Sequence, residues 1–166
     1  MRLFIAIKFS EEIKKELLRQ ISELKEKTVR GNFTRIENLH LTLAFIGESQ
    51  RITDIKRIID EACDGGFDIT LSGSGRFGSL YWVGLKKEQR LFTLANKLRE
   101  MLDKNGIPVD KKPFSPHITI AREVVSDEPV KLNVKEVSMP VCKISLMRSD
   151  RINGKLTYTE VYGKEL

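Results

Sequence analysis

The six residues His-Leu-Thr-Leu-Ala-Phe, at positions 40–45, return later in the chain as His-Ile-Thr-Ile-Ala-Arg, at positions 117–122. The histidine, threonine and alanine are identical in the two copies, and the residues between them are aliphatic. Side chains of a β-strand alternate between its faces, so the histidine and threonine of each copy share one face. We expect the aliphatic face to enter the core and the polar face to border a cleft.

The segments that lead into the two copies repeat as well. A buried strand is predicted over residues 3–9, and Ser10 is placed to cap the helix that follows. That helix is indicated by apolar residues at helical spacing: Ile13, Leu17, Ile21 and Leu24. A strand over 80–85 precedes the second copy, together with a helix that contains Leu91, Leu94, Leu98 and Met101. We therefore expect two related lobes that face one another.

Length and composition are those of one ordinary globular domain. The chain has 166 residues, of which 40% are hydrophobic and 31% are charged, a balance that argues against disorder. No Gly/Ser-rich or Pro-rich linker separates the two repeated units. We predict that residues 1–166 form a single compact domain of two pseudo-symmetric lobes, each with one His-X-Thr-X motif.

The chain is basic, with 29 Lys and Arg against 23 Asp and Glu and a net charge of +6 at pH 7. A positive excess favours polyanionic partners such as RNA or phosphorylated metabolites. No apolar run approaches the ~20 residues that cross a bilayer, and the first residues lack the features of a signal peptide. We expect a cytoplasmic monomer that does not contact membranes.

The other expected elements are shorter. The pattern predicts strands over 33–36, 40–46 (ended by Gly47) and 67–71, a helix over 55–62, and C-terminal strands from Val134 with a hairpin turn at Asn153-Gly154. Residues 73–78, Gly-Ser-Gly-Arg-Phe-Gly, match the dinucleotide-binding pattern, which must open a helix. Because a strand-like stretch follows instead, we interpret them as a turn or bulge and expect no nicotinamide site.

His40 and His117 are the only two histidines. A single histidine in such a pattern is usually structural, but two in matched motifs of a repeat favour a catalytic pair. Opening a cyclic phosphodiester needs a base that activates water and an acid that protonates the departing sugar oxygen. The ordinary histidine pKa of about 6.5 allows one imidazole to be neutral and the other charged near neutral pH. The motifs alone do not assign the two roles, because the halves look alike.

Three further residues suit the phosphate. The hydroxyls of Thr42 and Thr119 can donate hydrogen bonds to its non-bridging oxygens and orient the phosphorus. Arg122 is in the second copy, and its planar guanidinium is suited to phosphate charge. The alternative for Arg122 is a surface salt bridge. A zinc site would need a third ligand beside the histidines, and we interpret Cys63 and Cys142 as buried apolar fillers.

Residues 37–47, Glu-Asn-Leu-His-Leu-Thr-Leu-Ala-Phe-Ile-Gly, and 112–122, Lys-Pro-Phe-Ser-Pro-His-Ile-Thr-Ile-Ala-Arg, resemble the two-histidine phosphoesterase superfamily. Within it, the chain is similar to the bacterial and archaeal RNA 2′,3′-cyclic phosphodiesterases, also called 2′-5′ RNA ligases. The resemblance extends over nearly the whole chain and includes the opening Arg-Leu-Phe-Ile-Ala-Ile, residues 2–7.

The resemblance implies a fold, a reaction and a set of roles. The implied fold is α+β, bilobal and pseudo-twofold, with antiparallel sheets flanking a central cleft and helices outside. The implied reaction is metal-independent hydrolysis of an RNA 3′-terminal 2′,3′-cyclic phosphate to a 2′-phosphate, without a cofactor. By resemblance, His40 is the proton donor to the 3′-oxygen, His117 is the proton acceptor, and Arg122 contacts the phosphate. The expected partners are RNA ends with a cyclic phosphate, tRNA fragments among them.

Weaker signals and alternatives stay open. Lys111 and Lys112 could steer RNA phosphates, and Arg148 and Arg151 are similar cases, although a solvated loop is the commoner explanation. Phe4, Phe45 and Phe114 could stack on a base, although aromatic residues of strands are more often part of the core. The same site could instead catalyse reversible 2′-5′ RNA ligation or hydrolyse small cyclic nucleotides. A third alternative is a non-catalytic RNA-binding module, whose binding would survive loss of both histidines.

Overall fold

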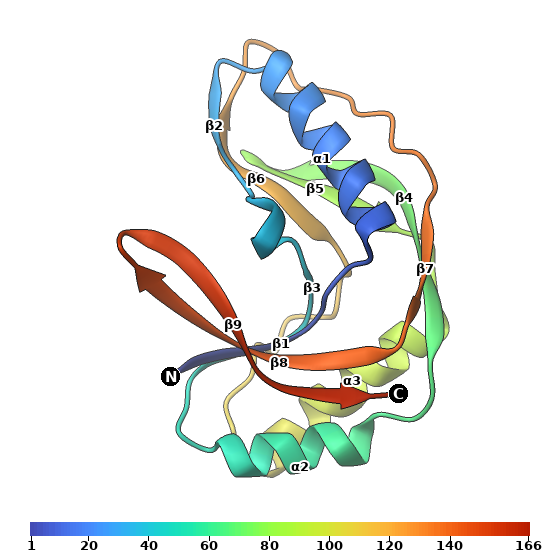
Figure 1. Cartoon of the computed structure of the whole chain (residues 1–166), viewed down its shortest axis with the longest axis vertical. Helices are drawn as coiled ribbons and strands as arrows, with labels where there is room; N and C mark the ends of the chain where they lie inside the picture. The colour runs from blue at the N-terminus through green and yellow to red at the C-terminus, as the bar shows by residue number, and fades with distance from the viewer.

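The computed structural model describes residues 1–166, which form two antiparallel sheets (Figure 1). The first sheet has the strand order β3-β1-β8-β9, with β1 Arg2–Ile7, β3 Leu41–Glu48, β8 Lys143–Ile152 and β9 Lys155–Glu165. The second has the order β2-β6-β5-β4-β7, with β2 Arg30–Phe33, β4 Phe67–Phe77, β5 Leu80–Leu85, β6 Ile118–Val125 and β7 Ser138–Val141. The predicted α+β fold with two antiparallel sheets is confirmed.

Each long connecting helix packs on the sheet of the other lobe. Helix α1 (Glu11–Glu26) follows β1 of the first sheet but contacts β2 and β6 of the second. Helix α3 (Gln89–Lys104) follows β5 of the second sheet but contacts β3 of the first, beside α2 (Ile52–Ala62) (Figure 1). The main apolar cluster, of 35 buried residues, therefore contains side chains from both sheets and all three α-helices.

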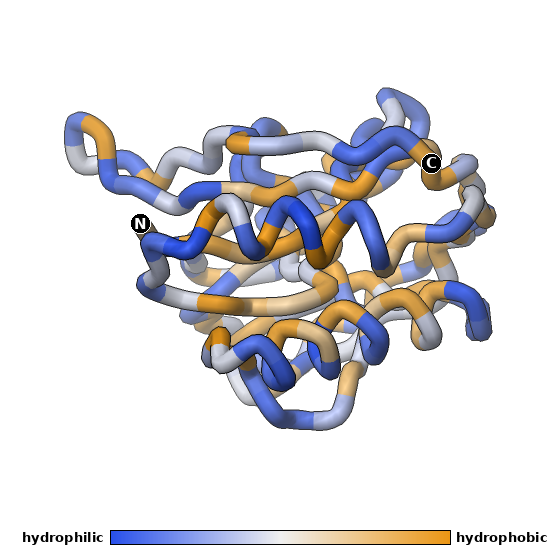
Figure 2. The backbone as a smooth tube through the Cα atoms, turned by 90° about the horizontal axis from the view of Figure 1, so that it is seen from below, coloured by the Kyte–Doolittle hydropathy of each residue, from blue (hydrophilic) through white to orange (hydrophobic).

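The helices form where the spacing of apolar residues predicts them. The Ser10 hydroxyl accepts a hydrogen bond from the backbone N–H of Ile13 at 3.3 Å, so Ser10 is the cap of α1. The apolar residues of α1 at helical spacing are all buried: Ile13, Leu17, Ile21 and Leu24. Figure 2, seen from below, shows a similar periodicity in the helices nearest the viewer, where hydrophobic and hydrophilic segments alternate along the turns. None of the helices combines the length and the apolar character that a membrane-spanning helix requires.

Some element bounds differ from the prediction. The strand expected over 33–36 lies at Arg30–Phe33 and is followed by the short 3₁₀ helix η1 (Ile36–Asn38). Gly47 does not end β3, which continues to Glu48. It adopts φ +85°, which glycine tolerates, at an irregularity in the pairing with β1. The glycine-rich motif lies mainly within β4, and the chain then turns directly into β5, so it opens no helix. The Asn153-Gly154 turn between β8 and β9 is confirmed, with φ of 52° and 76°.

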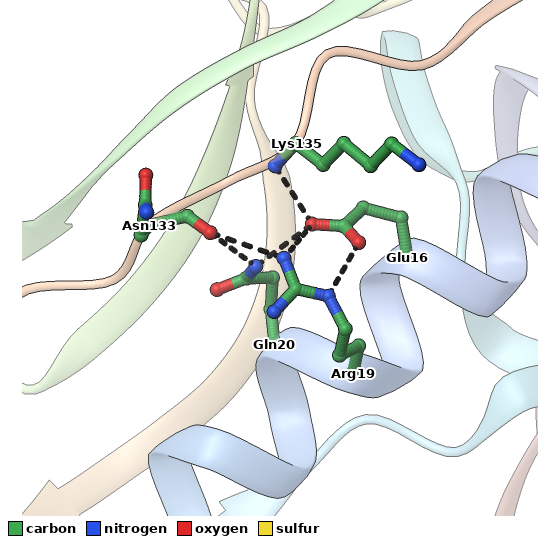
Figure 3. Close-up of polar contacts among 5 residues, drawn as sticks. All are labelled: Glu16, Arg19, Gln20, Asn133 and Lys135. Atoms are coloured by element: carbon green, nitrogen blue, oxygen red, sulfur yellow. Dashed lines mark hydrogen bonds and ion pairs between the residues drawn. The ribbon is translucent and has the colours of Figure 1, made fainter.

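A polar cluster around the buried side chains of Glu16 and Gln20 attaches the irregular segment between β6 and β7 to α1 (Figure 3). The Glu16 carboxylate accepts two hydrogen bonds of 2.7 Å from Arg19, one of 2.8 Å from Gln20 and one of 2.8 Å from the Lys135 backbone. Gln20 also donates to the Asn133 carbonyl at 2.9 Å. No strand forms within residues 126–137, so these bonds supply fixed attachment points for the segment.

Candidate active site

A cavity of about 670 Å³ lies between the two sheets. It is lined by residues of β1, β3, β6, β8 and β9 and by the two residues that directly precede β3 and β6, which are His40 and His117. The structure brings five of the predicted site residues together here: His40, Thr42, His117, Thr119 and Arg122. This is the central cleft that the sequence predicts.

The two histidines are fixed in the same way. The Nδ1 of His40 lies 2.7 Å from the carbonyl oxygen of Asn38, and the Nδ1 of His117 lies 2.7 Å from that of Ser115. A carbonyl oxygen can only accept, so Nδ1 bears the proton in both rings. The Nε2 of each ring is therefore the atom left for proton transfer.

The surroundings of the two rings differ. His40 packs against Phe4 and Tyr158, with ring centroids 4.9 and 5.1 Å away, and its Nε2 lies 3.0 Å from the Thr42 hydroxyl. Burial lowers the pKa of His40, and the nearby charges of Arg122 and His117 lower it further, although the bond to the Asn38 carbonyl opposes this. His40 is therefore neutral more readily than an exposed histidine.

His117 has a more open environment. Its ring lies beside Phe77 and Trp82, with ring centroids 5.3 and 6.4 Å away. The Phe77 side chain is itself exposed to solvent. Its Nε2 forms no hydrogen bond with the protein, unlike that of His40. This nitrogen is free to accept a hydrogen bond from water.

A β-bulge in β3 determines which residues face the cavity. The pairing with β1 skips one residue between Thr42 and Ala44, so Leu43 and Ala44 are both buried. The next residue, Phe45, consequently returns to the face of Thr42 and lines the cavity, where it is 42% exposed. Strict alternation would have turned Phe45 to the core.

The second motif contains the same bulge. The pairing of β6 with β5 skips one residue between Thr119 and Ala121, and both Ile120 and Ala121 are buried. Arg122 therefore faces the cavity at the position that Phe45 occupies in the first motif. No carboxylate forms an ion pair with Arg122, so its charge is available to an anion in the cavity.

Other cavity residues could not be identified from the motifs. They include Arg2 of β1 and Tyr158 of β9, whose hydroxyl has a pKa raised by burial although Arg122 and Arg2 oppose the shift. The hairpin residues Ser149, Asp150, Arg151 and Leu156 complete this wall. The alternation of polar and apolar residues marks the C-terminal strands, but it does not show which of their faces meets His40.

The structure does not bring Phe114 or Lys111 to the cavity. The Phe114 ring packs edge-on against Phe92 of α3, with centroids 5.3 Å apart, and against the core. Lys111 is exposed and forms an ion pair of 3.6 Å with Asp103. Among the weaker predictions, Phe4, Phe45 and Arg151 line the cavity, whereas Arg148 forms an ion pair with Asp150.

No group of three or more His, Cys, Asp or Glu side chains is arranged to hold a metal ion. Cys63 packs against the apolar core, but the prediction that Cys142 is buried is wrong, because this residue is exposed between β7 and β8.

The family model described as the 2′-5′ RNA ligase superfamily matches residues 10–153. The chain belongs to this superfamily. The RNA 2′,3′-cyclic phosphodiesterase of Thermotoga maritima is a relative with 31% identity over 168 residues, which cover 96% of this chain and 89% of that protein. The corresponding Escherichia coli K12 protein is 30% identical, over 95% of this chain and 92% of the relative.

Solved structures of the superfamily share the fold. Escherichia coli LigT complexed with 3′-AMP matches with a TM-score of 0.86 and 29% identity, and the match covers 99% of this chain and 97% of that one. The resemblance to the two-histidine phosphoesterases is thus confirmed, and so is the implied bilobal fold.

Proposed function

We propose that this protein hydrolyses the 2′,3′-cyclic phosphate at the 3′ end of RNA to a 2′-phosphate, using His40 and His117 and no metal ion. The observation that carries the proposal is the pair of histidines that present Nε2 to one cavity beside an unpaired arginine. The activity named for the relatives from Thermotoga maritima and Escherichia coli supports the same reaction.

In the proposed reaction, neutral His117 accepts a proton from water at Nε2. The water oxygen attacks phosphorus, the P–O3′ bond breaks, and protonated His40 donates its Nε2 proton to the 3′-oxygen. The product is a 2′-phosphate with a free 3′-hydroxyl. Thr42 and Thr119 donate hydrogen bonds to the non-bridging oxygens, and Arg122 stabilises the charge that develops on them.

The environments of the two rings support this division of roles. The free Nε2 of His117 has room for a water molecule, whereas the Nε2 of His40 already contacts a hydroxyl. A proton donor must be charged, and burial and Arg122 lower the pKa of His40 in the free protein. A bound phosphate offsets the charge of Arg122 and stabilises the imidazolium, so substrate binding itself favours the acid form of His40.

Alanine substitutions test the acid–base pair. His40→Ala and His117→Ala should each lower kcat on an RNA with a cyclic phosphate end by about 10²–10⁴-fold, the usual effect of one general acid or base. Both variants should keep the wild-type melting temperature to within a few degrees, because neither ring belongs to the main apolar cluster. Phe114→Leu, at an aromatic residue outside the cavity, is the matched control and should keep most of the activity. Full activity in both histidine variants would refute the proposal.

A further inference from the structure

A second cavity of about 400 Å³ opens directly from the catalytic one. The two cavities share residues on both sides of their junction, which are His40, Thr119, Arg122, Arg151, Leu156 and Tyr158. They therefore form one continuous depression that leads away from the histidines. We call this extension the hairpin groove, and it is bordered by residues 32–35 on one side and by residues 154–156 on the other.

Both walls of the hairpin groove are held together by hydrogen bonds. The β8–β9 hairpin projects beyond the end of its sheet (Figure 1). The guanidinium of Arg35 and the side-chain amide of Asn38 both donate to the carbonyl oxygen of Leu156 in this hairpin, the latter at 3.0 Å. The backbone carbonyl of Asn38 also accepts a hydrogen bond from His40 Nδ1–H, so Asn38 holds both the hairpin and the catalytic ring in place. These bonds thus fix the position of the hairpin relative to residues 35–38.

The lining of the hairpin groove is cationic and contains no carboxylate. Four basic residues border it: Arg35, Arg122, Arg151 and Lys155. Arg35 forms an ion pair with Glu37, but the other three have no acidic partner. The lining of the catalytic cavity, in contrast, includes one carboxylate, that of Asp150, which forms an ion pair with Arg148. A polyanion that leaves the catalytic centre is therefore favoured along the hairpin groove.

We propose that the hairpin groove binds the phosphodiester that precedes the terminal nucleotide of the RNA, with Lys155 as a cation for that phosphate. The proposal rests on the proposed function, because it assumes that the cyclic phosphate lies between His40 and His117. An RNA that ends in a 2′,3′-cyclic phosphate continues only on its 5′ side, so its next charge is this phosphodiester. The groove thus makes an oligonucleotide a better substrate than a cyclic mononucleotide.

A pair of substrates with the same terminal nucleotide tests the proposal. One is the nucleoside 2′,3′-cyclic phosphate, and the other is the dinucleotide with one added phosphodiester. Lys155→Gln should lower kcat/KM on the dinucleotide about three- to fivefold, the scale of one exposed ionic contact, and less than twofold on the mononucleotide. Lys155→Arg should keep the dinucleotide value. Lys97→Gln is the matched control, since Lys97 is exposed on α3 and lines neither cavity.

A neutral methylphosphonate in place of the internal phosphodiester identifies the group that Lys155 meets. It should lower kcat/KM in the wild-type protein but have little effect in Lys155→Gln, because the two changes remove the same contact. The salt dependence on the dinucleotide should also become shallower in that variant, by a slope of about 0.7.

Different results would overturn different proposals. An equal loss on both substrates in Lys155→Gln, or the same methylphosphonate effect in variant and wild type, would refute the hairpin groove and leave the proposed hydrolysis intact. Wild-type protein that turns over neither substrate would instead refute the proposed function.

Discussion

At the scale of single residues, the two active-site motifs differ mainly in their sixth position. Phe45 and Arg122 reach the same place through the same bulge, yet one is apolar and the other cationic. Only the second motif therefore supplies an arginine to the cavity, and the positive charge of this arginine lowers the pKa of His40. A nearly symmetric backbone thus presents an asymmetric pair of histidines.

The titration of His40 tests this asymmetry. We expect an NMR midpoint below the ordinary 6.5 in the free protein, because burial and the charge of Arg122 lower the pKa of His40. Saturating inorganic phosphate should raise the midpoint, since the anion favours the charged ring. Arg122→Met should raise it partway, because burial remains. A midpoint above 6.5 in the free protein would contradict the account.

Substitution at the equivalent positions should have unequal effects on catalysis. Arg122→Met removes the only arginine of the motifs, and we expect kcat/KM to fall about 10²–10³-fold, as when one transition-state donor is lost. Phe45→Leu, the matched change in the first motif, should cost less than about tenfold. The steady-state rates on the cyclic phosphate substrate measure both. Equal losses would show that Arg122 does not act on developing phosphate charge.

Much of the catalytic site is predictable from the sequence because it lies within the repeat. The positions of His40, Thr42, His117 and Thr119 follow from alternation along two strands. Tyr158 and the hairpin residues do not follow, because their place depends on how β8 and β9 pair with β1. The two bulges escape prediction for the same reason: the skipped residues Leu43 and Ile120 are defined only by the partner strand.

At the scale of elements, the helices were predictable and the irregular connections were not. Amphipathic spacing and the Ser10 cap are local features, so they are visible in the chain itself. The segment between β6 and β7 has no such pattern, and its path depends on Glu16, a buried acidic residue in α1. Burial alone raises the pKa of Glu16, but hydrogen bonds from Arg19, the Lys135 backbone and Gln20 outweigh burial and hold this pKa below its usual 4.5.

The Glu16 contacts make stability depend on pH. A carboxyl with a lowered pKa stabilises the fold above its unfolded pKa, and this contribution is lost as the pH falls through the folded value. Glu16→Gln should lower the free energy of unfolding at pH 7 by about 1–3 kcal/mol, as expected for a buried hydrogen-bond network with one partner changed. Urea unfolding at pH 7 and near pH 3 should show this difference shrinking in acid. An unchanged difference would contradict the role of the charge.

At the scale of the whole molecule, the exchange of helices joins the two sheets. We propose that residues 1–166 form a single domain of two pseudo-symmetric lobes, supported by the apolar cluster that both sheets share. The order β3-β1-β8-β9 corresponds to β6-β5-β4-β7, with β2 added at one edge. Displacement of α1 would expose the apolar face of the second sheet, and displacement of α3 would expose that of the first.

Leu98→Ala tests whether the lobes unfold together. Leu98 is fully buried in α3, which covers the first sheet, and its truncation should cost about 2–5 kcal/mol. The single tryptophan, Trp82, lies in the second sheet and reports on that lobe by fluorescence. Thermal midpoints from Trp82 fluorescence and from far-ultraviolet circular dichroism should fall together. Separate midpoints would show that the lobes are independent.

Mapping the end of the RNA product tests the proposed hydrolysis most directly. EDTA-treated protein is incubated with a short RNA that ends in a 2′,3′-cyclic phosphate, and the position of the resulting monophosphate is determined. We predict a 2′-phosphate, formed at the same rate with and without EDTA and about 10²–10⁴-fold more slowly with His117→Ala. A 3′-phosphate product, or activity that EDTA abolishes, would contradict the proposed reaction.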